Sequence, residues 1–515
     1  MTQPMHIGTR KQLFADRRVI AHSRGVRLTM NPPYQTGEQN VVRDTWWEQK
    51  PGSKIGGYST VMREDGTFRL WYQFGHQYEP WTKKGQDGQP KPKGDGRIEG
   101  GQSVLYTESE DGVHFTKPAL GLHEFYGTKA NNVVIPGYVQ GGHVWIDPNA
   151  PPEQRYRSQG NGQGYLPFYA SPDGIHWTET HRVVLTSTIT DSSKVDGRSN
   201  VLWDVELGRY VLFTRLFFPA AHSTPKGSGV YRGHRVVRRL ESDDLVHWDN
   251  ETLVLTHDEV DLAAHTVDLP DQPPVDYNFA TVFRYPDEYG LWFMLVTCYW
   301  HWYDRRPEGI VHNSGYNLGP NANDIRLLVS TDGKRFEWLG GRAPFIRLGP
   351  AGRFDSRMLH EMAYPIPMGN ELWLYYAGRN SEHGPVPSDG LDPAATTARD
   401  AISRAVMRRD GFVSADAEYP GGELTTPPLI LEGDRLLLNM DTSGGGQVKV
   451  EIQDESGVLI AGYALSDARP LNGNAVAMPA RWTDGDDIGQ LAGRPVRLRF
   501  VMNDCKLYAF QGTAA

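Results

Sequence analysis

The chain has 515 residues and a formal net charge of −9, with 53 Lys and Arg against 62 Asp and Glu. It has no stripe of clustered Lys and Arg and no apolar run near 20 residues, so we expect neither nucleic acid nor a membrane as a partner. The 56 Gly and 35 Pro, together with 14 Trp, 24 Tyr and 18 Phe, favour many turns and many strands. The composition therefore predicts an all-β protein.

The N-terminus and the cysteines bear on the compartment. The segment from Met1 to Arg10 has no apolar stretch of the kind that forms the core of a secretory signal. Cys298 and Cys505 are the only cysteines and are far apart in the sequence, which excludes a disulfide framework and a zinc cluster. We therefore expect a reduced, cytoplasmic protein.

A short motif recurs along most of the chain. It consists of Ser, a variable residue, Asp, usually Gly, two further residues and an aromatic residue. An Asp-Gly step predicts a tight turn with positive φ, and the aromatic residue is expected to pack back onto the sheet. The copies are Ser109–Phe115, Ser171–Trp177, Ser242–Trp248, Ser330–Phe336 and the degenerate Met407–Phe412.

Each copy follows a pair of short strands rich in Val, Tyr, Phe and Trp. The pairs are Tyr58–Arg63 and Phe68–Gln73; His143–Asp147 and Arg155–Gln159; Asn200–Asp204 and Tyr210–Arg215; Phe279–Tyr285 and Leu291–Thr297; Met362–Pro367 and Leu372–Ala377. Five such units, each closed by the same turn, predict a five-bladed β-propeller over residues 1–420. A series of separate β-sandwiches is the alternative, but it would not predict one turn motif closing every unit.

After Pro420 the repeat of paired strands and Ser-x-Asp-Gly turns ends, and Leu424–Pro428 is a plausible hinge. The alternating residues of Val448–Ile452 indicate a half-buried antiparallel strand. We expect residues 421–515 to form a β-sandwich. Its role is either structural, covering the propeller or mediating a homo-oligomer, or the binding of sugar.

In its motifs the chain resembles the clan of glycosidases that includes glycoside hydrolase families 32, 43, 62 and 68, and especially bacterial family-32-like proteins. The segments that carry the resemblance are Leu13–Asp16, Asp44–Glu48, Leu70–Tyr72, the Ser-x-Asp-Gly turns, Leu374–Gly378 with His383, Arg408–Phe412, Val496–Phe500 and Leu507–Phe510. The resemblance covers nearly the whole chain and implies a propeller glycosidase.

The sequence also departs from family 32. The Asn-Asp-Pro-Asn, Arg-Asp-Pro and Glu-Cys motifs of that family are absent in those forms. Ile146–Asn149 contains Asp-Pro-Asn, but it lies at the far end of a strand in the second unit, where a turn explains it better. Asp147 is therefore not assigned as a nucleophile, and specificity for sucrose or fructan is not implied.

In a propeller, the residues just before the innermost strand of every blade converge on the channel. That rule selects four carboxylates as catalytic candidates: Glu48, Asp196, Asp276 and Glu361. Glycoside hydrolysis needs one protonated acid and one nucleophile or base, and crowding separates the pKa values of neighbouring carboxyls. Alternatives stay open, because Asp196-Gly197 is also a generic turn and Glu361 is also placed to pair with Arg357.

The same rule selects side chains for binding substrate. Trp46 and Trp47 are placed to stack on sugar rings, although one of them is expected to pack in the core, and His143, His360 and His383 to hydrogen-bond hydroxyls. The full set is Asp44, Trp46, Trp47, His143, Arg198, Asn200, Tyr277, Asn278, Arg357, His360 and His383. We expect no cofactor and assign no metal ligands, although a cation on the axis stays open because oxygen ligands leave no spacing signature here.

The main hypothesis is an exo-acting glycosidase that releases a sugar, with a furanose as one candidate, from an oligosaccharide. A non-catalytic carbohydrate-binding propeller is the second hypothesis. A lyase or epimerase acting on uronates is the third, and it requires Arg198, Arg357 and a His or Tyr base to face the ligand.

Overall fold

The structure is a computed structural model in which nearly all regular structure is β-strand. It describes residues 3–82, 89, 100–137, 140–161, 164–190, 197–219, 233–263, 275–301, 321–362, 364–381 and 399–514. Over these residues the single α-helix is α1 (Glu259–Ala263), accompanied by short 3-10 turns such as η1 (Arg17–Val19) and η5 (Gly340–Arg342). None of the described helices is long and apolar enough to cross a membrane. The all-β prediction is confirmed.

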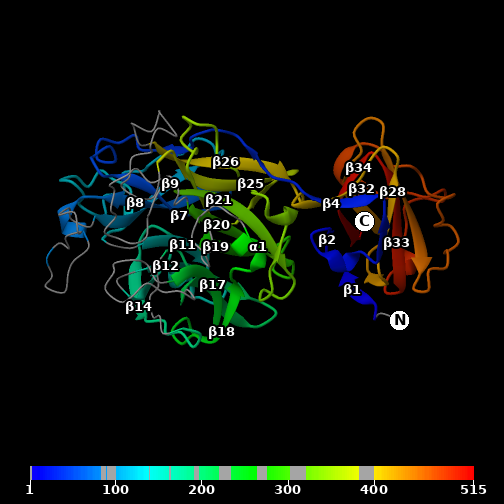
Figure 1. Ribbon diagram of the computed structural model, residues 1–515, viewed down its shortest axis with the longest axis horizontal. Coiled ribbons are helices and arrows are strands. Elements are labelled where there is room, and N and C mark those ends of the chain that lie inside the picture. The colour runs from blue at the N-terminus through cyan, green and yellow to red at the C-terminus, as the bar shows by residue number, and fades with distance from the viewer. Residues whose placement is uncertain are drawn as a thin grey trace.

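The chain forms two lobes, and both termini lie in the smaller one (Figure 1). The larger lobe contains five consecutive antiparallel β-units. The first three are β7 (Lys54–Glu64), β8 (Thr67–His76), β9 (Gly101–Ser109) and β10 (Val133–Ile135); β11 (Gln140–Ile146), β12 (Tyr156–Asn161), β13 (Leu166–Ser171) and β14 (Thr178–Val183); and β15 (Asn200–Asp204), β16 (Arg209–Pro219), β17 (Gly233–Ser242) and β18 (Asp249–Leu255).

The fourth and fifth units belong to one ten-stranded sheet, in which β21 and β23 are joined through a parallel pairing of Asn323 with Met358. The fourth is β19 (Val275–Tyr285), β20 (Leu291–His301), β21 (Asn321–Ser330) and β22 (Glu337–Trp338). The fifth is β23 (Met358–Glu361), β24 (Ile366–Met368), β25 (Glu371–Arg379) and β26 (Asp400–Arg408), with β5 (Tyr34–Gln35) and β6 (Val41–Val42) paired to β26.

The five units close into a ring. The first strand β7 packs against β11, β11 against β15, and β15 against β19. Strand β23 then packs against β20 and β21 on one side and against β7 on the other. The first strands of the units therefore line the centre of the ring, and the labels of β7, β11 and β19 lie inward of those of β14 and β18 in Figure 1.

The repeated turn has one geometry in four units. In the second unit, Ser171 Oγ accepts a hydrogen bond from the amide of Gly174, and Asp173 Oδ1 accepts from the amides of Ile175 and His176. Gly174 has φ of +77°, the left-handed conformation that glycine adopts without strain. The turns at Ser109, Ser242 and Ser330 repeat these bonds, with Leu245 in the glycine position of the third unit. The predicted turn motif is thus confirmed in these units.

The smaller lobe contains two six-stranded sheets. One consists of β1 (Met5–Gly8), β29 (Leu429–Leu431), β33 (Pro495–Asn503), β28 (Gly422–Thr425), β3 (His22–Arg24) and β31 (Gln447–Asp454). The other consists of β32 (Asn474–Pro479), β30 (Arg435–Asp441), β34 (Cys505–Thr513), β27 (Val413–Ala417), β4 (Val26–Met30) and β2 (Gln12–Leu13). Apolar side chains of both sheets share one core, which includes Leu438, Val450 and Phe500.

The strand pairing differs from the expected division at residue 420. Strands β1 to β4, at the N-terminus, pair with strands from the last hundred residues, for example β4 with β27 and β1 with β29. The predicted boundary missed this because the partners of a strand so distant in sequence leave no local signal. The N-terminal segment therefore belongs with the C-terminal sheets.

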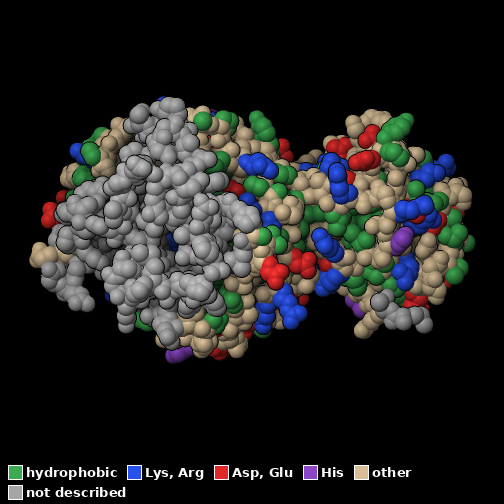
Figure 2. All heavy atoms as spheres, viewed as in Figure 1, with side chains coloured by type: hydrophobic (Ala, Val, Ile, Leu, Met, Phe, Trp, Pro, Cys, Tyr) green, Lys and Arg blue, Asp and Glu red, His purple; other side chains and the backbone are tan. Residues whose placement is uncertain are grey.

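A second apolar cluster joins the lobes. It combines Phe283 and Phe293 of the fourth unit with Phe412 and with Leu13 and Ala509 of the smaller lobe. The rings of Phe293 and Phe412 stack at 4.4 Å between centroids. Charged side chains of both signs gather along the waist between the lobes (Figure 2). The lobes thus meet through a shared apolar core with a charged rim.

Candidate functional site

Side chains from all five units meet at the centre of the ring. We call this group the axis cluster, and it consists of Tyr58 (β7), His143 (β11), Arg198 and Asn200 (at the start of β15), Phe279 (β19), His360 and Glu361 (β23), and Arg379 (β25). Positions so far apart in sequence come together because the first strands of the units pack around the ring. Five residues of the predicted site lie in this cluster: His143, Arg198, Asn200, His360 and Glu361. Their roles stay predictions, and His360 and Glu361 lie at the end of β23 rather than just before an inner strand, as the sequence rule assumed.

Hydrogen bonds hold the buried polar part of the cluster. Arg198 Nη2 lies 3.3 Å from His143 Nδ1, and Arg198 Nη1 donates to the backbone oxygen of Glu361 at 3.2 Å. Asn200 Nδ2 lies 3.1 Å from His143 Nε2, and the hydroxyl of Tyr364 lies 3.3 Å from that same nitrogen. Burial, with a further contribution from the charge of Arg198, lowers the pKa of His143 to about 3. His143 is therefore a neutral hydrogen-bonding group in this network.

Glu361 is the carboxyl at the centre of the cluster. Its side chain is 1% exposed, and the hydroxyl of Thr297 is hydrogen-bonded to Oε2. Among the described residues, Oε1 has no hydrogen-bond partner. Burial raises the pKa of Glu361 to about 8, while Arg198 and Thr297 act in the opposite direction. The carboxyl is therefore protonated at neutral pH, as a general acid must be.

An aromatic group borders this carboxyl. The ring of His360 stacks on Phe279 at 5.1 Å, and Tyr58 contacts Phe279 edge-on at 4.9 Å. Gly57 permits the approach, because a Cβ there would lie 2.2 Å from Cγ of His360. Burial lowers the pKa of His360 well below its usual value, so the imidazole is neutral.

Two further pairs join the third and fourth units beside the cluster. Asp276 forms an ion pair with Arg235 at 3.0 Å and also accepts from the amide of Arg235. Arg215 donates to the backbone oxygen and to the side-chain oxygen of Asn278, both at 2.6 Å. Asp276 is thus a carboxylate held by a guanidinium, in contrast to Glu361.

Glu48 has a different environment. It is 0% exposed, and its carboxylate accepts from Lys117 Nζ at 2.7 Å, from the hydroxyl of Thr45 at 2.8 Å and from Tyr72 at 3.0 Å. Asp44 is exposed and binds the same lysine at 2.6 Å. Lys117, Thr45 and Tyr72 do not belong to the axis cluster. The strand β7 begins at Lys54, before the expected Tyr58, so in this unit Tyr58 rather than Glu48 reaches the centre.

The two neighbouring tryptophans differ in burial. Trp47 is 2% exposed and packs edge-on against Phe74 and Phe125, in the core between the first and fifth units. Trp46 is 55% exposed, with Lys50 Nζ 5.1 Å from its ring centroid. The expectation that one of the pair is structural therefore applies to Trp47, and Trp46 is left as a surface aromatic ring.

The remaining predicted residues are spread around the ring. Tyr277 stacks on His257 at 4.8 Å and donates to Asp261 at 2.6 Å, so it packs outside the axis cluster. Arg357 is half-buried, and its backbone binds Asn323 and Arg379. Asp196 and His383 lie outside the described residues, and their roles stay predictions.

Sequence reasoning missed four members of the site: Tyr58, Phe279, Tyr364 and Arg379. The signal for Arg379 was an arginine at the end of the apolar strand Leu372–Ala377, and the signal for Tyr58 was the Gly56-Gly57 pair before it. For Tyr364, which follows β23, the sequence carries no such signal, because the inner strand of the fifth unit was expected at Met362–Pro367 and lies at Met358–Glu361.

In the part of the chain that the structure describes, no group of three or more His, Cys, Asp or Glu side chains is placed to hold a metal ion. The axis cluster consists instead of one carboxyl, two guanidiniums, two imidazoles and aromatic rings.

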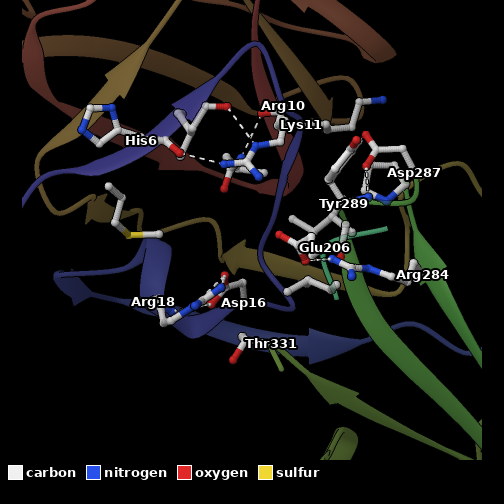
Figure 3. A pocket seen from close by; sticks show the side chains of 17 residues that line it. His6, Arg10, Lys11, Asp16, Arg18, Glu206, Arg284, Asp287, Tyr289 and Thr331 are labelled. Atoms are coloured by element: carbon white, nitrogen blue, oxygen red, sulfur yellow. Dashed lines mark hydrogen bonds and ion pairs between the residues drawn. The ribbon is translucent and has the colours of Figure 1, made fainter. Parts of the chain in front are cut away.

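A cleft of about 370 Å³ opens at the waist between the lobes (Figure 3). Its charged side chains pair with one another or with nearby residues: Lys11 with Asp410 at 2.8 Å, Arg18 with Asp16 at 2.8 Å, and Arg284 with Glu206 at 2.5 Å. Arg10 donates to the backbone oxygen of His6 at 2.8 Å. Two of these contacts lie within the N-terminal segment, and the pair of Arg284 with Glu206 lies within the larger lobe, so the charged groups of the cleft are largely paired on their own side of it.

Comparisons with known proteins give no family for the chain. No family model and no curated protein matches the sequence. One similar solved structure is named "Glycoside hydrolase", with 14% identity, coverage of 73% of this chain and 92% of that chain, and a TM-score of 0.44.

Two further solved structures are similar. The catalytic domain of the GH62 alpha-L-arabinofuranosidase of Coprinopsis cinerea is 12% identical, with 73% and 98% of the two chains covered and a TM-score of 0.39. A glycoside hydrolase family 43 arabinoxylan arabinofuranohydrolase from Bacillus subtilis is 12% identical, with 94% and 99% covered and a TM-score of 0.37. These names agree with the resemblance noted from the sequence. Since every TM-score is below 0.5, the case for a function rests on the chemistry of the site.

Proposed function

We propose that the protein is a glycoside hydrolase whose general acid is Glu361 and whose second carboxylate is Asp276. The observation that carries the proposal is the burial of Glu361 in the axis cluster, to which all five units contribute, with one carboxyl oxygen that has no partner among the described residues. Glycoside hydrolysis needs a protonated carboxyl at the leaving oxygen and an ionised one for attack. The contrast between buried Glu361 and ion-paired Asp276 supplies both forms.

The chemistry assigns each group one task. Glu361 gives its proton to the glycosidic oxygen as the bond from the anomeric carbon to that oxygen breaks. Asp276, ion-paired with Arg235, attacks the anomeric carbon or removes a proton from the attacking water. Water supplies the anomeric hydroxyl of the released sugar. The second product is the leaving group, the rest of the oligosaccharide, which takes up the proton from Glu361 as an alcohol.

The finer architecture belongs to the same proposal. We assign the closed ring of five β-units to a five-bladed β-propeller and the two six-stranded sheets to a β-sandwich that includes the N-terminal strands. Exo action, a furanoside substrate, a cytoplasmic location and homo-oligomer formation stay predictions. Chain-length analysis of oligosaccharide products tests the first two, and cell fractionation and light scattering test the others.

The decisive experiment compares leaving groups. A panel of aryl pyranosides and furanosides first identifies a substrate, and Glu361→Gln and Asp276→Asn are then assayed on it. If Glu361 is the acid, Glu361→Gln reduces turnover strongly for poor leaving groups and little for dinitrophenyl glycosides, which leave without protonation. Equal loss for both leaving groups would contradict the assignment.

Glu48→Gln is the matched comparison, because Glu48 is equally buried and was also predicted to be catalytic. We expect it to retain turnover below its melting temperature. Product analysis separates hydrolysis, which releases a saturated reducing sugar, from elimination, which leaves an unsaturated one.

A further inference from the structure

Two guanidiniums of the axis cluster lack a carboxylate partner. Among the described residues, neither Arg198 nor Arg379 forms a hydrogen-bonded ion pair, and the Nε atom of each has no hydrogen-bond partner. Arg198 is 1% exposed and binds only the backbone oxygen of Glu361 and neutral His143. Arg379 Nη2 lies against Met358 Sδ at 2.8 Å. Both side chains therefore retain donors that no carboxylate of the described residues uses.

Nearby acids do not compensate these charges. The carboxyl next to Arg198 belongs to Glu361, which burial keeps protonated at neutral pH. The carboxylate that acts on Arg379 belongs to Asp400, which is ion-paired with Arg43 at 2.8 Å. Burial lowers the pKa of both arginines, as expected for cations removed from water without full compensation.

The two guanidiniums contact the same strand. Arg198 donates to the backbone oxygen of Glu361 and Arg379 lies against Met358, both in β23. Tyr58 interacts electrostatically with both arginines and contacts the Phe279 ring on which His360 stacks. Nδ1 of His360 also has no partner among the described residues. Donors from the third and the fifth unit thus lie along β23, the strand that ends at Glu361.

A buried charge without a partner is unfavourable, and an anion that binds it removes that penalty. The planar guanidinium presents parallel N–H donors that match the two oxygens of a carboxylate, and phosphate oxygens fit the same donors. A neutral sugar offers only hydroxyl groups and leaves the charges uncompensated. The cluster therefore favours an anionic ligand over a neutral one.

We propose that Arg198 and Arg379, which both contact β23, form an oxyanion subsite that binds the negatively charged group of an acidic sugar beside Glu361. The identification of the sugar as substrate rests on the function proposed above. A uronic acid carries its carboxylate on the sugar itself, whereas inorganic phosphate is an oxyanion that binds without a sugar. Titrating each ligand alone distinguishes these two sources of negative charge.

The test measures binding by isothermal titration calorimetry. Glucuronate and galacturonate are compared with glucose and galactose, and inorganic phosphate is titrated alone in a buffer free of other oxyanions. We expect the wild-type protein to bind a uronate at least about tenfold more tightly than the neutral sugar of the same configuration. Binding of phosphate without binding of either uronate would assign the subsite to a free anion.

Arg198→Gln and Arg379→Gln are expected to weaken anion binding by about tenfold to a hundredfold. Arg182→Gln is the matched control, since Arg182 is an exposed arginine of the second unit that pairs with Glu179. Arg198→Lys keeps the positive charge but loses the paired N–H donors of the guanidinium, so it should bind the anion more tightly than Arg198→Gln and less tightly than the wild type. Melting temperatures without ligand show whether each variant folds, and if Arg198→Gln does not fold, half-buried Arg379 carries the test.

Anion binding unaffected by both arginine variants, or no anion binding by the wild type, overturns the subsite. The subsite and the proposed hydrolase activity can fail independently. If the protein turns over neutral aryl glycosides but binds no anion, the subsite is wrong and the hydrolase proposal stands. Anion binding that depends on the arginines, together with turnover that is insensitive to Glu361→Gln, keeps the subsite and removes Glu361 as the general acid.

Discussion

Glu48 and Glu361 are both almost fully buried glutamates, with exposures of 0% and 1%, yet their surroundings differ. Glu48 accepts hydrogen bonds from Lys117, Thr45 and Tyr72, so each of its oxygens has charged and neutral donors. Glu361 has one hydroxyl partner and one oxygen without any among the described residues. A nearby arginine bonds to its backbone oxygen rather than to its carboxyl.

The difference shows that burial by itself does not make a carboxyl into an acid. Desolvation raises a carboxyl pKa, but an ion pair of good geometry opposes that effect. Glu48 is bonded to Lys117, Thr45 and Tyr72 and so holds the segment before β7 on the first unit. Glu361 stays protonated at neutral pH because its pKa is raised to about 8.

The largest expected effect separates the two glutamates by activity. Glu361→Gln should reduce turnover of an aryl glycoside with a poor leaving group by about a hundredfold to ten-thousandfold, because the proton donor is removed. Steady-state kinetics checks this, with Glu48→Gln assayed in parallel. A larger loss in Glu48→Gln at a temperature where it is folded would reverse the two roles.

The second prediction separates Glu48 from Glu361 by the effect of Glu48 on stability. Glu48→Gln should lower the free energy of unfolding by about 3 kcal/mol, because it leaves buried Lys117 with only exposed Asp44 as a charged partner. Urea denaturation followed by tryptophan fluorescence measures the change. Lys117→Met combined with Glu48→Gln should recover part of the loss, and a loss in the double variant equal to the sum of the two single losses would contradict an ion pair.

The third prediction concerns pH. Folded Glu361 keeps its proton up to about pH 8, whereas the unfolded chain releases it near the ordinary value of 4.5. Between these values the folded state binds more protons, so the contribution of Glu361 to stability falls as pH rises and levels off above about 8. The change is on the order of a few kcal/mol and should be absent in Glu361→Gln. The rate kcat/KM should likewise fall as pH rises through about 8.

The fourth prediction tests how tightly the centre is packed. Gly57→Ala places a Cβ 2.2 Å from the His360 ring, so the ring or the strand must shift. We expect a loss of about 1–3 kcal/mol in stability. We also expect reduced turnover, because His360 precedes Glu361. Gly66→Ala, where no atom lies within 4 Å but φ is +88°, controls for backbone strain alone.

The smallest effect is expected at the rim, where the carboxylates are exposed and serve turns. Asp173→Ala removes the acceptor for the amides of Ile175 and His176 and should lower stability by about 1 kcal/mol, with turnover unchanged. Thermal denaturation checks the first part and kinetics the second. A loss comparable to that of Glu48→Gln would mean that the turn organises the whole unit.

Much of the ring was predictable because the turns and strands of each unit are encoded by residues that are close together in the sequence. The bond that closes the Ser-x-Asp-Gly turn joins residues only three apart, and it repeats at Ser109, Ser171 and Ser330. The pairing of β1 to β4 with the C-terminal strands was not predictable, since an N-terminal strand carries no mark of a partner four hundred residues away. The same limit hid Tyr364 and Arg379 from the predicted site.

The sequence by itself determined that the chain is nearly all β, that it repeats one turned unit, and that carboxylates and arginines stand near the starts of strands. Those properties follow from local patterns of turn, strand and charge. Only the tertiary structure decided which buried glutamate has a cation as its partner. That choice depends on Lys117 meeting Glu48 and on Arg198 meeting the backbone of Glu361, contacts between segments 69 and 163 residues apart. A pKa is a property of that assembled surrounding, because desolvation and nearby charge exist only after the units have packed.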